Sequence, residues 1–183
     1  GNVSFDAGVN LVQDMDINSQ FGNITFNRNV NSLTGKDLSL TSGLSVSGSP
    51  NGDILLKGSL GGVSAMGDIV VNKPYDFSIL GNVVGNSLII NGAGGSVTFS
   101  GTLSIQGTTN VGADFVSLSV ETTQVSGFIL FQQAITAAGN VVINNAGSFI
   151  TGLNGDISSS GSFIQKGDWA SFLSGDITTT FGG

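Results

Sequence analysis

Carboxylates are the main side chains that could carry chemistry in this chain. The 183 residues include 12 Asp and Glu and five Lys and Arg, but no His and no Cys. A Ser-His-Asp or Cys-His nucleophile pair, a conventional zinc site and a Cys-ligated iron–sulfur cluster each need one of the missing residue types. The sequence therefore excludes those classes of enzyme and metalloprotein.

The segment Asp14-Met15-Asp16 holds the strongest candidates. Residues two apart on a strand lie on one face, so Asp14 and Asp16 would present two carboxylates together. Such a pair fits a calcium site or, with Asp37 added, the acids of a carbohydrate-active enzyme. The competing interpretation is a solvated strand face. We expect no catalytic residue, no metal site and no cofactor, with calcium at Asp14 and Asp16 as the alternative.

A second group of aspartates follows glycine: Asp53, Asp68, Asp156, Asp168 and Asp176. Calcium-binding solenoids also use Gly-Asp turns, but their nonapeptide Gly-Gly-x-Gly-x-Asp does not occur here. A short Asp side chain hydrogen-bonds nearby backbone amides in turns. We therefore expect these aspartates to cap turns.

Charge and hydropathy limit the partners. The five cations, Arg28, Lys36, Lys57, Lys73 and Lys166, are scattered, and the net charge is -7. Nucleic acid is not an expected partner, because backbone binding needs clustered cations. Apolar runs such as 128–131 are about four residues long, far below the roughly 20 needed to cross a bilayer as a helix. We expect no membrane span.

A short phrase recurs along the chain: Gly, then Asn or Asp, then a β-branched residue and an alternating or apolar tail. Copies begin at Gly1, Gly22, Gly52, Gly67, Gly139, Gly155 and Gly175. Many separations between copies fall in the range that indicates a solenoid repeat. With 29 Gly, 39% hydrophobic residues and a mean hydropathy of +0.31, the chain is apolar enough to fold and too rich in Gly for long helices.

These features predict an all-β fold, a parallel β-helix (β-solenoid) of roughly nine coils of about 20 residues each. Residues 1–183 would form one domain. In each phrase, Gly would supply a positive φ for the bend, and Asn or Asp would cap the turn. Because stacked like charges repel, low charge is expected. The alternative is an antiparallel β-sandwich, but the Asn-Gly and Asp-Gly hairpin dipeptides are scarce.

Four phrases resemble coils of filamentous-haemagglutinin-like adhesins and autotransporter passengers of Gram-negative bacteria. They are 22–27 (GNITFN), 36–43 (KDLSLTSG), 101–107 (GTLSIQG) and 139–147 (GNVVINNAG). The resemblance implies a right-handed parallel β-helix that is exported and serves as an adhesive or spacer stalk. It supplies no cofactor and no catalytic residues.

The chain starts and ends inside repeat phrases, with no cap visible at either end. We therefore expect partners at the ends, either flanking repeats of a longer chain or further copies stacked head to tail, which would form a filament. A host or neighbouring-cell glycan or protein is the other expected partner. Residues 113–138 are the predicted contact surface, with Phe128, Phe131 and Trp169 as candidate contact residues. The competing interpretation places 128–131 in the core.

The function predicted from the sequence is non-catalytic. The chain would be a structural or adhesive protein of a bacterial cell-surface fibre or adhesin stalk, located outside the cell or on its surface, and able to self-assemble end to end. One alternative is a carbohydrate-binding or carbohydrate-active β-helix protein. Another is a cytosolic scaffold solenoid that polymerises.

Overall fold

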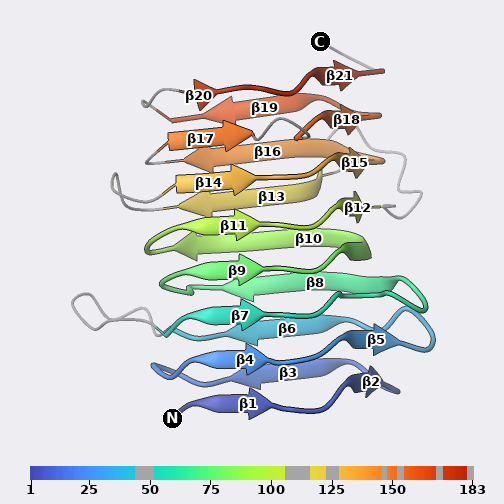
Figure 1. Ribbon diagram of the computed structural model, residues 1–183, viewed down its shortest axis with the longest axis vertical. Helices are drawn as coiled ribbons and strands as arrows, with labels where there is room; N and C mark the ends of the chain where they lie inside the picture. The colour runs from blue at the N-terminus through green and yellow to red at the C-terminus, as the bar shows by residue number, and fades with distance from the viewer. Residues whose placement is uncertain are drawn as a thin grey trace.

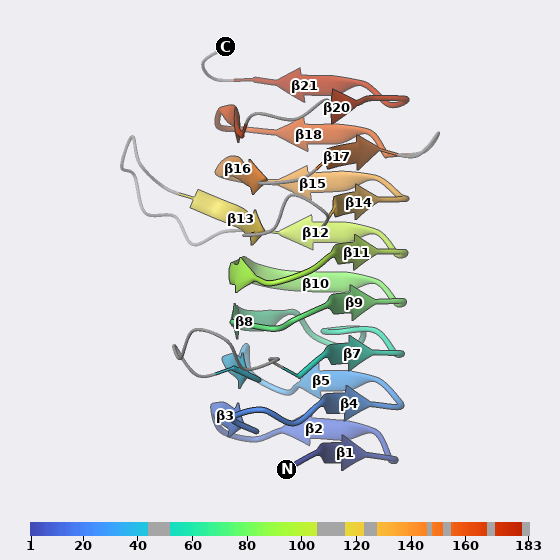
Figure 2. The same cartoon turned by 90° about the vertical axis from the view of Figure 1, so that its left-hand side faces the viewer.

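The computed structural model is a stack of parallel β-strand coils around one long axis (Figure 1). It describes residues 1–43, 52–105, 116–122, 128–145, 148–151, 155–167 and 171–180. All pairings among its strands are parallel. The predicted β-solenoid is therefore confirmed, and the antiparallel sandwich is wrong. Followed from the N-terminus through Figures 1 and 2, the coils wind in the right-handed sense.

Each complete coil visits three faces. The first face is an eight-stranded sheet, here called sheet A. Its strands are β1 (Val3–Phe5), β4 (Ile24–Phe26), β7 (Ile54–Leu56), β9 (Phe77–Ile79), β11 (Val97–Phe99), β14 (Phe128–Phe131), β17 (Ser148–Thr151) and β20 (Ser171–Phe172).

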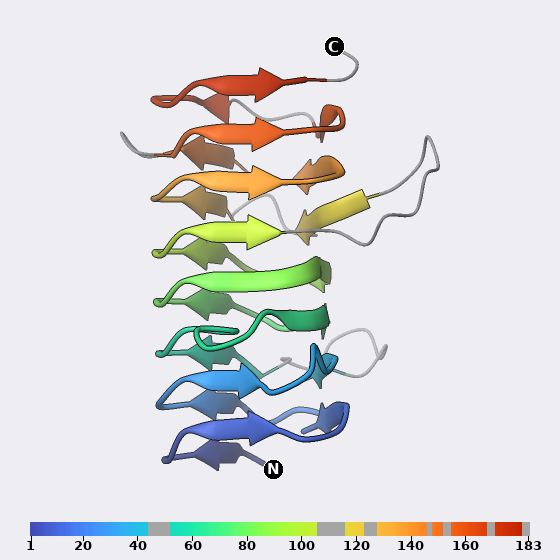
Figure 3. The same ribbon diagram turned by 90° about the vertical axis from the view of Figure 1, so that its right-hand side faces the viewer.

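The second face, here called the β2 face, is turned toward the viewer in Figure 3. Its strands are β2 (Val9–Leu11), β5 (Val30–Ser32), the start of β10 (Val83–Ala93), β12 (Leu103–Ile105), β15 (Ile135–Ala137), β18 (Ile157–Ser159) and β21 (Ile177–Thr179). Leu60 continues this face as a single bridge between Val30 and Val83.

The third face, here called the β3 face, carries the longer strands. They are β3 (Met15–Asn18), β6 (Leu38–Thr41), β8 (Met66–Asn72), the rest of β10, β13 (Val116–Thr122), β16 (Asn140–Asn145) and β19 (Phe163–Lys166). Because β10 pairs with β12 at its start and with β8 and β13 further on, it joins the third face and most of the second into one 11-stranded sheet. Strands β2 and β5 pair with each other as a separate two-stranded sheet.

The chain passes through sheet A eight times, so the prediction of nine coils is slightly too high. Most partners in adjacent strands of sheet A are 20 to 23 residues apart. The steps from Ile24 to Ile54 and from Val97 to Ile129 are longer, at 30 and 32 residues. These two long coils account for the missing ninth coil.

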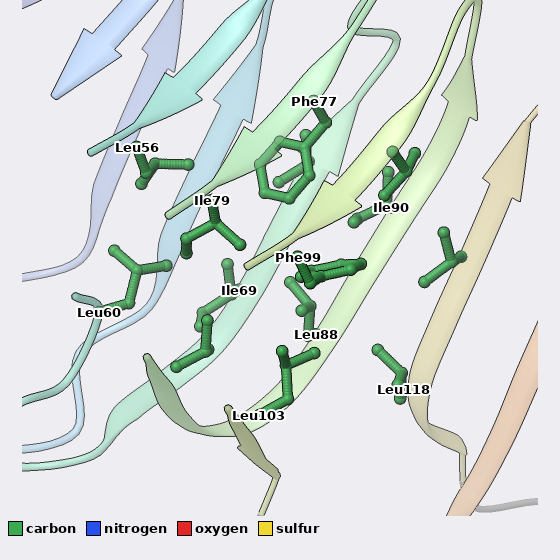
Figure 4. Packing of buried hydrophobic residues seen from close by; sticks show 14 of the residues in the cluster. Leu56, Leu60, Ile69, Phe77, Ile79, Leu88, Ile90, Phe99, Leu103 and Leu118 are labelled. Carbon is green, nitrogen blue, oxygen red and sulfur yellow. The ribbon is translucent and has the colours of Figure 1, made fainter. Parts of the chain in front are cut away.

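The core is a column of apolar side chains that runs along the rod. Strand residues alternate between the interior and the surface, as in β4, β9 and β11, where the first and third residues are buried. Figure 4 shows Phe77 and Phe99 from sheet A meeting Leu88 from the β3 face and Leu103 from the β2 face. Phe99 also stacks on Phe131 of the next coil, with ring centroids 5.0 Å apart.

The phrase glycines are required by close approach between coils. The described glycines with positive φ are Gly35, Gly61, Gly92 and Gly167, none of which opens a phrase, so the predicted role of positive φ is wrong. A Cβ on Gly81 would lie 2.5 Å from the backbone carbon of Gly58 and 2.5 Å from the nitrogen of Ser59. Neighbouring backbones at the corners therefore leave no room for a side chain.

We expect Gly81→Ala to destabilise the protein by about 1–3 kcal/mol, because the added methyl group forces two coils apart. Gly62→Ala is the matched control, since its Cβ would meet no atom closer than 3.6 Å. It should be neutral or stabilising by up to about 1 kcal/mol. The measurement is the urea unfolding midpoint followed by far-UV circular dichroism. Equal midpoints for the two variants would contradict the close-approach argument.

Candidate functional site

The predicted acids Asp14 and Asp37 take part in hydrogen bonding between coils. Asp14 Oδ1 accepts the backbone N–H of Asp37 at 3.1 Å, and Asp37 Oδ1 accepts that of Asp68 at 2.8 Å. Asp16 lies exposed in β3, opposite Ser39 of β6. Two of the three carboxylates are thus used to join coils, which favours a structural role over general acid or base catalysis.

The same bond recurs at every corner, in what we call the corner columns. In each, a residue just before or near the start of a strand accepts, through its side-chain oxygen, the backbone N–H of its counterpart in the next coil. Before sheet A the column is Asn2, Asn23, Asp53, Asp76 and Ser96. Before the β2 face the columns are Asn29, Ser59, Asn82 and Thr102, and then Asp156 and Asp176. Before the β3 face they are Asp14, Asp37 and Asp68, and then Asn140 and Ser162.

Two of the five Gly-Asp aspartates cap a backbone amide, and they do so in the neighbouring coil rather than in their own turn. Asp53 and Asp156 each accept such a bond, whereas Asp68 accepts from the side chains of Asn86 and Ser87. Asp168 lies outside the described residues. No three acidic side chains of the described residues gather closely enough to hold a metal ion.

Stacked carboxylates occur in these columns, at Asp14, Asp37 and Asp68 and again at Asp53 and Asp76, although the chain as a whole has the low charge that was expected. Two charges one strand spacing apart, about 5 Å, repel by roughly 1 kcal/mol in water. A hydrogen bond to a charged acceptor contributes about 1.5–3 kcal/mol. Where solvent screens the pair, as at the exposed Asp14 and Asp37, the bond to the amide of the next coil outweighs the repulsion between the stacked carboxylates.

The candidate contact residues do not form a surface in the described structure. Phe131 is completely buried and stacks on Phe99, so the core interpretation holds for this residue and its place on a contact surface is wrong. Ile129 of the same strand is also fully buried. The side chain of Phe128 and the whole of Trp169 lie outside the described residues, as do 113–115 and 123–127 of the predicted contact region.

An open cavity of about 500 Å³ lies at the corner between sheet A and the β2 face, in the first two coils. Its lining is polar and contains no acid: Ala7, Gly8, Asn10, Arg28, Asn29 and Asn31. The sequence analysis missed this site. The signal available was the single Arg of the chain, set among Asn27, Asn29 and Asn31.

An exposed aliphatic ridge lies beside this cavity, and it too was missed. Val12, Leu33 and Val63 are 72%, 61% and 79% exposed. Each follows by three residues one of Val9, Val30 and Leu60, which are stacked in successive coils. Val12 and Leu33 thus lie in adjacent coils, two residues beyond Asn10 and Asn31, and Val63 belongs to the next coil.

Among the described residues, no helix has the length and apolar character needed to cross a bilayer.

The corner columns generate a test that separates caps from calcium ligands. Asp76 Oδ1 accepts the N–H of Ser96 at 2.7 Å. Asp76→Ala should lower the free energy of unfolding by about 1.5–3 kcal/mol, whereas Asp76→Asn, which keeps an acceptor oxygen, should change it little. The unfolding midpoint of the parent chain should be the same in excess calcium and in EDTA. A midpoint that rises with calcium, or an Asn variant as unstable as the Ala variant, would favour metal binding.

No protein-family model matches the chain, and comparisons with curated proteins and with solved structures find no significant match. The resemblance to haemagglutinin-like repeats therefore stays a prediction from the sequence, while the β-solenoid fold stands on the structure itself.

Proposed function

We propose that the chain is a non-catalytic structural and adhesive rod of a bacterial cell-surface fibre or adhesin stalk. The observation that carries the proposal is the continuous parallel ladder of sheet A, in register from β1 to β20. Because successive coils are bonded by parallel strands and, along much of the rod, by corner columns, the rod resists bending and gives reach. At a strand spacing of about 4.8 Å, eight coils extend roughly 40 Å.

The outer surface supports contact without strong charge. On the β2 face, Ser104, Thr136, Ser158 and Thr178 stand in register on adjacent strands. The last three are exposed. A hydroxyl both donates and accepts hydrogen bonds, so such a row can bond to a glycan or a protein surface. This row is the surface that we assign to adhesion.

The two ends of the rod support the proposed partners. Core side chains of the first coil are only half-buried, among them Val3, Phe5 and Met15, and so are Phe163 and Ile177 near the other end. A further coil stacked on either end would bury them. We propose that this coil comes from flanking repeats of a longer chain or from a second copy.

Immunogold electron microscopy tests the location. Antibodies raised against the purified chain should label intact cells of the bacterium that encodes it, on the surface or along fibres. Permeabilised cells are the control for antibody access. Labelling that appears only after permeabilisation would overturn the proposal and favour the cytosolic scaffold alternative.

A double variant tests the non-catalytic part of the proposal. Asp14→Asn with Asp16→Asn should leave cell adhesion unchanged, because an asparagine at position 14 keeps an acceptor oxygen for the amide of the next coil and the hydroxyl row stays intact. Product analysis after incubation with a panel of glycans is the second measurement. Glycan cleavage by the parent chain that the double variant loses would favour the carbohydrate-active alternative.

A further inference from the structure

The cavity around Arg28 exists because its neighbouring coils carry small residues. By strand register, Ala7 and Gly8 of the first coil lie beneath Arg28 and Asn29 of the second. Gly58 of the third coil lies against the backbone of the same two residues from above. The guanidinium is therefore flanked by positions with little or no side chain, which leaves space for a ligand.

Arg28 is free to bind an anion. Its guanidinium has no hydrogen bond or ion pair with any residue in the described part of the chain, and the side chain is exposed. Lys57 follows β7 directly above Asn27, so two of the five cations occupy this corner. The nearby carboxylate of Asp6 already accepts bonds from Asn27 Nδ2 and Ser4 Oγ. The corner is locally basic on a chain of net charge -7.

Asn31 needs a hydrogen-bond donor that the described residues do not supply. Its Nδ2 donates to Asn10 Oδ1 across a long 3.4 Å, and its Oδ1 is buried without a partner. The reason is an interrupted amide ladder, since the next position in this column is Gly61, which has no side chain to donate. An unpaired buried acceptor is unfavourable, so this oxygen favours a ligand that brings a hydrogen-bond donor. Rotation about the last side-chain bond, which has a broad energy profile, would turn this amide toward a ligand.

We propose that this cavity binds a carboxylated saccharide. Arg28 would pair with the carboxylate through its planar fork of N–H donors. The amides of Asn10 and Asn31 would bond ring hydroxyls, which donate as well as accept, whereas a simple carboxylate or phosphate has no donor for Asn31 Oδ1. The volume of about 500 Å³ falls within the usual range for small-ligand sites. The aliphatic ridge beside the cavity offers contact to the C–H face of a further sugar.

Titration of the ¹⁵N-labelled 183-residue chain with trigalacturonate tests this proposal. We expect the backbone amide signals of residues 7–10 and 28–31 to shift, and a neutral trisaccharide such as maltotriose to bind much more weakly. Arg28→Gln, which removes the charge but keeps an amide, should weaken trigalacturonate binding about tenfold or more. Lys166→Gln, an exposed cation in β19 far along the rod, is the matched control and should bind like the parent.

A second variant provides an independent test if circular dichroism shows that Arg28→Gln disturbs folding. Ala7→Leu fills the cavity from the first coil while Arg28 itself is kept, and it should abolish binding. Absence of shifts at these amides, equal binding of maltotriose, or equal weakening by Arg28→Gln and Lys166→Gln would each overturn the proposal. The experiment does not depend on the proposed cell-surface role, because it measures binding to the isolated chain.

Discussion

The close approach of successive coils at their corners is the constraint on which the rest of the molecule depends. Parallel strands must lie about 4.8 Å apart, and at a corner the same spacing applies to backbones that are turning. Gly81 shows the consequence, since its Cβ position is occupied by the backbone of Gly58 and Ser59. Once glycine stands there, the next residue lies close enough to the coil above for its side chain to reach a backbone amide. Most corner columns therefore contain such glycines, although the Asp14–Asp37 bond forms without one, and both features keep the coils in register.

This arrangement decides which polar groups are free for function. The side-chain oxygens of Asn23, Asp53 and their counterparts already accept backbone N–H groups of the next coil, so their role is structural. Binding capacity arises where a column is interrupted. Gly61 above Asn31 breaks an amide ladder, and Gly58 above Arg28 removes a side chain. Within the described part of the chain, this leaves the Asn31 oxygen and the nearby Arg28 guanidinium without partners. Small residues thus have two opposite effects. At Gly81 a glycine lets two coils approach closely, whereas at Gly58 a glycine leaves the space of a cavity.

The sequence predicted the strands that follow a Gly-Asn or Gly-Asp pair, such as Ile24–Phe26 and Ile54–Leu56, because local turn chemistry marks where they begin. It did not mark Val9–Leu11 or Ile135–Ala137, which lack that pair. The phrase also occurs at all three corners, before β4, β16 and β18 alike. The sequence separation between two copies therefore corresponds to a whole coil in some cases and to part of a coil in others. The cavity could not be predicted from the sequence for a related reason. It depends on which residues lie in neighbouring coils, some 20 to 30 positions away in the chain.

The two long coils indicate how such a rod can change its surface without losing its structure. Between Ile24 and Ile54 the chain is about ten residues longer than a standard coil, yet the register on both sides is unbroken, with Phe26 opposite Leu56 and Leu56 opposite Ile79. The cost of closing a loop grows slowly with its length, so extra residues at a corner are inexpensive compared with a shift of register, which would expose the apolar face of a strand. Stability is therefore set by the inward residues and the corner glycines, while contact chemistry can vary at the corners. The Arg28 cavity lies at a corner of standard length, between sheet A and the β2 face, where a change of one small residue alters binding and leaves the ladder of sheet A intact.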